Sequence, residues 1–103
     1  MTRPPAPAVL TVTGTASIRE RIALPGGGVL TVKLVSDDGE VLAAVAEPAE
    51  DGPIEFALTV DAALAPTAKK LRLWAMLRTE VGVWGTPELV TVRDELMLTR
   101  VDA

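Results

Sequence analysis

Apolar and polar side chains alternate with a period of two residues through most of this chain, and no other feature constrains its fold as strongly. In residues 53–60, PIEFALTV, every second side chain is apolar and large: Ile54, Phe56, Leu58 and Val60. Successive side chains of a β-strand point to opposite faces of a sheet, so this alternation predicts strands with one buried and one exposed face. Helical spacing would not gather these four side chains on one face. We therefore expect an all-β protein.

The same alternation recurs in several segments separated by turn-forming residues. We expect strands over residues 9–22, 29–36, 40–47, 53–60, 71–79, 81–92 and 95–101. Asp38-Gly39 predicts a hairpin turn between the second and third of them, because Asp-Gly tolerates the positive φ of tight hairpins. About seven strands at this spacing predict a single immunoglobulin-like β-sandwich over residues 9–103. A flexible, Pro-rich leader is expected over residues 1–8.

Four places depart from the simple pattern. Gly14 interrupts the first strand, which indicates either a bulge or the close approach of a neighbouring segment. The alanines of residues 40–47 favour a helix, but the shortness of the segment and the preceding turn favour a strand. Asp61 is placed to cap one short helical turn near residues 61–65. Pro87 indicates an edge or a bulge in the segment 81–92.

The absent residue types exclude much catalytic chemistry. The 103 residues contain no Cys and no His, which removes disulfides, thiolate nucleophiles and the commonest metal ligand. We expect no catalytic residue, no cofactor and no metal site, and hence no enzyme. The net charge of −4 argues against nucleic acid as a partner. No apolar run approaches the roughly 18 residues that a membrane span requires.

One segment predicts a binding surface. In LRLWAMLRT, residues 71–79, the apolar side chains of one parity are expected to face inward. The opposite face carries what we call the Trp74 stripe: Arg72, Trp74, Met76 and Arg78. Trp, Met and Arg are enriched at protein interfaces, so the stripe predicts a protein-binding site. In the alternative, the faces are reversed or both are buried, and Trp74 is an ordinary core residue.

A second candidate is the charged triplet Arg19-Glu20-Arg21. By parity Glu20 shares the inward face with Ile18 and Ile22, and the two arginines face outward. An inward carboxylate requires a partner, or a bulge that turns it outward. The triplet either protects an edge strand against pairing with other chains or contacts a partner peptide through Arg19 and Arg21.

The stretch GTASIRERIALP, from Gly14 to Pro25, followed by VLTVKL at residues 29–34, resembles the YbaY/YscW family of small lipoproteins, which includes type III secretion lipoprotein chaperones or pilotins. Residues 53–77 and 95–101 resemble the family more loosely, so the resemblance covers most of residues 11–101. It implies a compact immunoglobulin-like sandwich with no catalytic residues and no cofactor. The signal peptide and lipidated cysteine of the family's lipoproteins do not occur in this sequence, so membrane anchoring is not carried over.

These observations predict a non-enzymatic interaction or assembly-accessory module that binds a protein segment. One alternative is a carbohydrate- or small-ligand-binding module in which Trp74 or Trp84 stacks on a sugar. Another is a structural domain that self-associates as a homo-oligomer through the same apolar face. The sequence as it stands predicts a cytoplasmic location, and a cell-envelope or periplasmic one if an export signal has been removed upstream.

Overall fold

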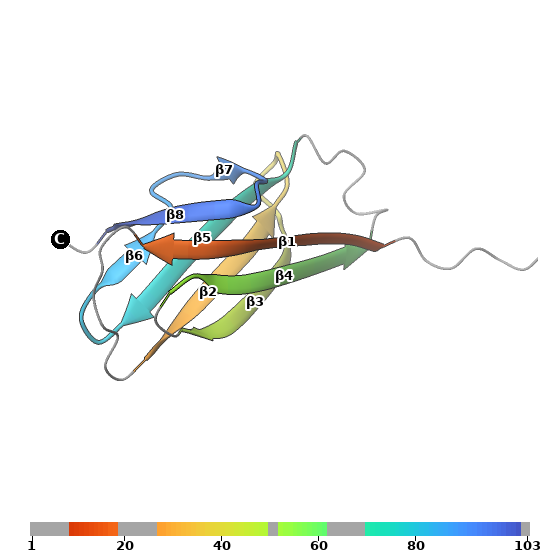
Figure 1. Cartoon of the computed structure of the whole chain (residues 1–103). Helices are drawn as coiled ribbons and strands as arrows, with labels where there is room; N and C mark the ends of the chain where they lie inside the picture. The colour runs from red at the N-terminus through yellow and green to blue at the C-terminus, as the bar shows by residue number, and fades with distance from the viewer. Residues whose placement is uncertain (1–8, 19–26, 50–51, 62–69, 102–103) are drawn as a thin grey trace, which may run out of the picture.

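Two layers of β-strands pack against each other, and one strand takes part in both (Figure 1). The structure, a computed structural model, describes residues 9–18, 27–49, 52–61 and 70–101. These residues form the strands β1 (Val9–Ile18), β2 (Gly28–Val35), β3 (Val41–Ala49), β4 (Ile54–Asp61), β5 (Arg72–Thr79), β6 (Val83–Gly85), β7 (Val90–Thr91) and β8 (Glu95–Arg100). The predicted all-β class is confirmed. Within these ranges no helix is long and apolar enough to cross a membrane.

Hydrogen bonds join the strands into one path with the order β3-β2-β5-β6-β8-β1-β4, and β7 pairs with β5 beside this path. Strand β8 connects the layers, because residues 95–98 pair in parallel with β1 whereas Thr99 and Arg100 pair with β6. The result is a barrel-like sheet that stays open between β3 and β4. In Figure 1, β1, β4 and β8 cross in front of β2, β3 and β5. The predicted immunoglobulin-like form of the sandwich is not confirmed, since its two sheets would be separate.

The core consists of the alternate apolar residues that the sequence predicts to face inward. In β4, the four apolar side chains of residues 54, 56, 58 and 60 are buried and their neighbours are exposed. They meet inward-facing side chains of β2 and β5, such as Leu30, Leu34, Leu73 and Leu77. Trp84 of β6 heads the fully buried side chains by volume, with 0% exposure. Each fully buried leucine contributes about 1.5–3 kcal/mol relative to an exposed one.

The hairpin predicted at Asp38-Gly39 is confirmed and joins β2 to β3. Gly39 has a φ of 90° and donates its amide to the Ser36 carbonyl at 3.0 Å. The alanine-rich segment forms a strand, as predicted, and β3 extends beyond it to Ala49. Asp61 is the last residue of β4, and the helical turn expected near residues 61–65 otherwise lies outside the described residues.

The single strand predicted over residues 81–92 is wrong. β6 ends at Gly85 and β7 begins at Val90. Between them, the Thr86 amide donates to the Ala75 carbonyl at 3.0 Å, and the Thr86 hydroxyl accepts from the Ala75 amide at 3.1 Å. The chain then leaves the sheet at Pro87, which has no N–H to donate.

Gly14 marks a close approach of two backbones. A Cβ on this residue would lie 2.7 Å from the Asp94 carbonyl oxygen and 3.0 Å from Cζ of Phe56. The adjacent Thr15 amide donates to the same carbonyl at 2.8 Å. The pairing of β1 with β4 runs through Gly14 without a shift, which excludes a bulge at this position. The close-approach interpretation of the sequence is therefore confirmed.

We expect Gly14→Ala to destabilise the protein by about 1–3 kcal/mol, because the new methyl group must displace the Asp94 backbone. Urea unfolding followed by circular dichroism measures the change. The control is Gly82→Ala, whose Cβ would first meet the guanidinium group of Arg100, at 2.9 Å. That variant should lose less stability than Gly14→Ala, because the end of a long side chain can turn aside whereas the Asp94 backbone cannot. Equal stability of the two variants would contradict the close approach.

The β2–β3 turn holds the carboxylate of Asp38 in its ionised form. The Ser36 hydroxyl donates to it, and the Glu40 amide donates to it at 3.2 Å. These hydrogen bonds lower the pKa of Asp38 from its ordinary value of 3.8. A carboxyl group with a lowered folded-state pKa stabilises the fold above its unfolded-state pKa. That contribution is lost as the pH falls through the folded-state value.

We expect Ser36→Ala to move the pKa of Asp38 back toward its ordinary value, because it removes the largest of the causes that lower this pKa. An NMR titration of the Asp38 carboxyl carbon measures this pKa in both proteins. In the variant, the stability contributed by this turn above the unfolded-state pKa should be smaller, and its loss on acidification should be complete at a higher pH. An identical Asp38 titration in the two proteins would rule out the Ser36 hydrogen bond as the cause.

Candidate protein-binding face

Strand β5 lies in the interior of its layer. Its side chains alternate between the core and the outer face of the sheet. Leu73, Ala75 and Leu77 are buried against the other layer. The Trp74 stripe lies on the outer face, where Arg72, Trp74 and Met76 are half-buried and Arg78 is exposed. The predicted faces are therefore confirmed, and Trp74 is not a core residue.

Strand β2 adds a cation beside the tryptophan. Its pairing with β5 places Lys33 opposite Trp74, Thr31 opposite Met76 and Val29 opposite Arg78. Lys33 Nζ lies 4.8 Å from the centroid of the Trp74 ring, which is within cation–π distance. We call the combined surface of these three β2 residues and the Trp74 stripe the β2–β5 face. The sequence analysis did not predict that Lys33 lies beside Trp74. The alternation of residues 29–36 shows that Lys33 points outward, but it does not show which residue of another strand lies next to it.

Small side chains border the β2–β5 face. Gly85 of β6 lies opposite Met76. On the other side, Ala46 and Ala44 of β3 lie opposite Thr31 and Lys33. The border is therefore low beside Met76, Thr31 and Lys33, whereas Pro48 and Val83 lie opposite Val29 and Arg78 at one end of the face.

The β2–β5 face is cationic in an acidic chain. Strands β2, β5 and β6 contain Lys33, Arg72 and Arg78 and no acidic residue, whereas the whole chain has a net charge of −4. Among the described residues, a salt bridge joins Lys70 to Asp37 at 3.7 Å. None of the three cations of the face has a described carboxylate within 4.0 Å. Arg78 instead contacts the Met76 sulfur at 3.9 Å. Within the described residues neither guanidinium group pairs with a carboxylate, so both can meet acidic groups of a partner.

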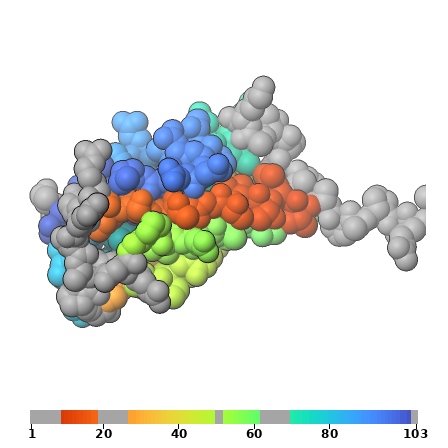
Figure 2. All heavy atoms as spheres, in the orientation of Figure 1, coloured from red at the N-terminus to blue at the C-terminus, as the bar shows by residue number. Residues whose placement is uncertain are grey.

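The opposite layer has the reverse charge. Strands β1 and β4 contain no Lys or Arg, and Glu55 and Asp61 lie on β4. The neighbouring strand β8 carries one charge of each sign, Glu95 and Arg100. In Figure 2 the atoms of β1 (red) lie between those of β4 (green) and β8 (blue) on this layer. The two outer surfaces of the protein therefore differ in charge.

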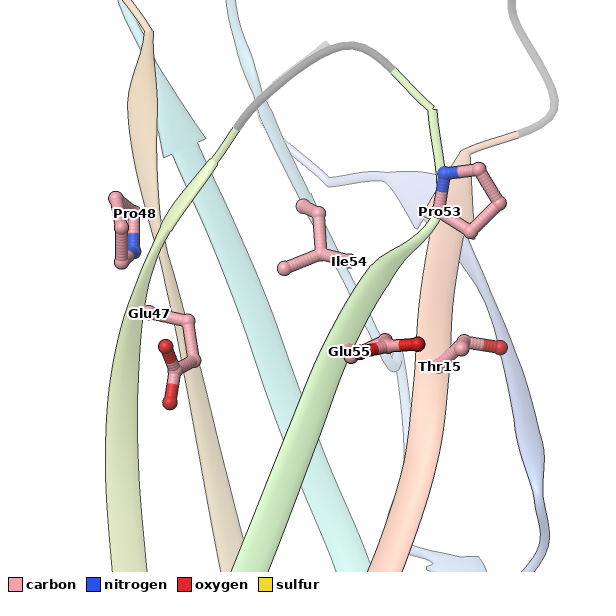
Figure 3. Close-up of a pocket in the computed structure, with 6 residues that line it drawn as sticks. All are labelled: Thr15, Glu47, Pro48, Pro53, Ile54 and Glu55. Carbon is pink, nitrogen blue, oxygen red and sulfur yellow. The ribbon is translucent and has the colours of Figure 1, made fainter.

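A second candidate is a hollow of about 320 Å³ where the sheet is open between β3 and β4. Its lining residues are Thr15, Glu47, Pro48, Pro53, Ile54 and Glu55. Figure 3 shows Glu47 on β3 and Glu55 on β4, on either side of Ile54. Two carboxylates on an open surface do not form a metal site, and no group of three or more His, Cys, Asp or Glu gathers in the described part of the chain.

The remaining predicted residues do not join the face. Trp84 is enclosed in the core, and the Arg100 guanidinium carbon lies 5.3 Å from its ring centroid. The idea that Trp84 stacks on a sugar is therefore wrong. Arg19 and Arg21, together with Glu20, lie outside the described residues, so their roles remain predictions.

Comparisons with known proteins find a matching family model and a solved structure with a similar fold. A family model described as "type III secretion system lipoprotein chaperone (YscW)" matches residues 7–98. The fold is similar to a solved structure of an alternative pilotin from the type II secretion system of Vibrio cholerae, with a TM-score of 0.72. The match has 23% sequence identity and covers 93% of this chain and 100% of that one, and at this identity it shows the fold. None of the curated proteins matches this chain.

We expect the two tryptophans to differ in fluorescence. Trp74→Phe leaves only the enclosed Trp84, whose emission should be blue-shifted and resistant to acrylamide. Trp84→Phe leaves Trp74, whose emission should be red-shifted and readily quenched. Circular dichroism controls for folding, because Trp84→Phe removes core volume. A blue-shifted, quencher-resistant Trp74 in a folded variant would contradict the outward stripe.

Proposed function

Because the chain belongs to the YscW family of type III secretion system lipoprotein chaperones, as the resemblance of residues 14–34 predicted, we propose that it is a non-enzymatic assembly accessory that binds a protein segment of a secretion system. The family description supports the chaperone role. The similarity to the Vibrio cholerae pilotin supports a fold suited to it.

The observation that carries the proposal is the composition of the β2–β5 face. Trp74 and Met76 lie outward beside Arg72 and Arg78, which have no carboxylate partner among the described residues. Burying an aromatic ring and a thioether against a partner releases ordered water, and the guanidinium groups supply directional hydrogen bonds. Trp, Met and Arg are also the residue types enriched at interface centres.

The scaffold favours binding because it holds the face rigidly. β5 pairs along its whole length with β2, and with β6 and β7 on the other side. Its inward leucines are buried in the core. A partner therefore meets side chains whose backbone is already ordered, which lowers the entropy cost of association.

The alternatives have less support. A sugar would compete with Lys33 for one side of the Trp74 ring, since the ammonium group already lies over it. Self-association would bring Arg72 and Arg78 of two copies toward the same face, where like charges repel.

For location, we favour the cell envelope, because the family is described as one of lipoproteins. The cytoplasmic location expected from the sequence as it stands has no support in this family.

We expect Trp74→Ala with Met76→Ala to reduce severalfold the amount of assembled secretion complex in envelope fractions of the encoding bacterium. The complex is quantified by native electrophoresis and immunoblotting. Thermal unfolding should change little, because both side chains lie outside the core. The control is Met97→Ala, which removes a 53%-exposed side chain from β8. Normal assembly with the double variant, at normal protein levels, would refute the proposal. So would a dimer in light scattering that this variant dissociates, since the face would then serve self-association.

A further inference from the structure

We infer that the free edge of β4 binds an extended, basic segment of another protein, which adds to the sheet as a strand antiparallel to β4. The inference goes beyond the proposed function and does not rest on it, because β4 belongs to the other layer and shares no residue with the β2–β5 face.

β4 forms one edge of the open sheet. Among the described residues it pairs with β1 alone, from Ile54 to Asp61, and it is the last strand of the hydrogen-bonded path. In Figure 2 the atoms of β4 (green) border those of β1 (red) on the side away from β8 (blue). A strand edge of this kind can accept a further strand through its backbone.

The direction of the backbone groups of β4 follows from its pairing with β1. The Thr15 amide donates to the Asp94 carbonyl at 2.8 Å, so the backbone of Thr15 points toward β8 and away from β4. Glu55 lies opposite Thr15, and in an antiparallel pair two opposite residues point either toward each other or away from each other. Glu55 therefore directs its N–H and C=O to the free edge. Because these directions alternate along a strand, Ala57 and Thr59 do the same.

The edge of β4 lacks the features that commonly prevent strand addition, which are Pro, Lys and bulges. β3, the other edge of the sheet, has Pro48, which cannot donate, and an irregular register opposite Leu34 and Val35. β4 contains neither Pro nor Lys, and its register with β1 has no shift. Its exposed side chains between Glu55 and Asp61 are the small Ala57 and Thr59. The two edges therefore differ, and β4 is the one open to pairing.

The charges around this edge select a basic segment. Strands β1, β3 and β4 contain no Lys or Arg, whereas Glu47 lies on β3 and Glu55 and Asp61 lie on β4. Glu47 and Glu55 line the hollow between the two strands (Figure 3), and neither has a described cation within 4.0 Å. In an added strand, the residue opposite Glu55 lies about 5.5 Å away between Cα atoms. A Lys or Arg there forms a cross-strand ion pair. A second copy would instead bring its own carboxylates to this edge.

The inner side of the edge selects apolar residues between the basic ones. Phe56 and Leu58 point into the core, and Ile54 lines the hollow. Alternate side chains of an added strand lie beside these apolar groups, and the others lie beside Glu55 and its exposed neighbours. The bound segment therefore alternates apolar residues with polar ones that include Lys or Arg.

The test uses the fluorescein-labelled peptide Lys-Val-Thr-Val-Thr-Val-Lys, whose lysines can lie opposite Glu55 and Asp61 in the antiparallel register. Anisotropy titration with the full chain should show saturable binding that weakens as salt is added. Glu55→Gln should weaken binding severalfold, because it removes the ion pair. The matched control is Glu88→Gln, which makes the same change of charge at an exposed position between β6 and β7 and should bind as the parent does.

N-methylated peptides test strand pairing apart from charge. In the proposed pairing the amides of the two threonines face β4, whereas those of the valines point away from it. N-methylation of both threonines should therefore weaken binding about tenfold or more, because it removes two hydrogen bonds and places methyl groups against the edge. N-methylation of two valines should change binding little. Equal effects of the two modifications would overturn the inference.

A block on the protein side complements the peptides. Ala57→Pro removes an N–H at the free edge without removing a hydrogen bond to β1, and its ring occupies the place of the added strand. This variant should lose most of the binding while its circular dichroism spectrum stays that of the parent. If the variant does not fold, the N-methylated peptides decide the question with the parent protein.

Other results would also overturn the inference. These are the absence of binding to the parent, equal binding of a peptide with Gln in place of both lysines, or loss of binding in the Trp74 and Met76 double variant, which would place the peptide on the β2–β5 face. A dimer of the parent in light scattering that Ala57→Pro dissociates would assign the edge to a second copy. None of these results bears on the assembly assay, so the proposed function is tested separately.

Discussion

The burial of alternate side chains from two β-layers in one aliphatic core is the constraint on which the rest of the structure depends. A strand cannot bury Leu73, Ala75 and Leu77 without sending residues 72, 74, 76 and 78 to the other face. Shifting the register of β5 by one residue would expose its leucines, so the core holds the Trp74 stripe outward. The candidate binding face is therefore a geometric consequence of the core, maintained by the same free energy that folds the protein.

Strand β8 connects the two layers and closes the sheet around the core on one side. The strand pairs with β1 and then with β6, so the two layers form one hydrogen-bonded sheet. Gly14 is needed where the end of the β7–β8 connection approaches β1, because only a residue without Cβ admits the Asp94 carbonyl. Trp84 fills the volume enclosed by β6 and is covered by Arg100. The rigid sheet that results presents different charges on its two outer surfaces, cationic over β2 and β5 and acidic over β4.

The difference in charge between the two surfaces bears on how a member of this family recognises its partner. A chaperone of the YscW family recognises another protein, so the described surface of this chain limits how it can do so. What its described surface offers is a tryptophan and a methionine among cations without acidic partners. Since β2 and β5 have no free edge, recognition through this surface depends on side chains and not on strand pairing. The fully paired backbone of β2 and β5 therefore limits how a partner can bind to this surface.

The alternation of side chains determined, from the sequence alone, the all-β class, the inward leucines and the outward Trp74 stripe, because a period of two residues is a local property of a strand. The resemblance of residues 14–34 likewise indicated the family. Only the tertiary structure decided that β8 joins the layers into a barrel-like sheet, that β6 and β7 are separated at Thr86, and that Trp84 is buried. It also decided that Lys33 lies over Trp74. Each of these depends on which strands become neighbours and in which register, and those pairings link residues that are far apart in the chain and carry no local pattern.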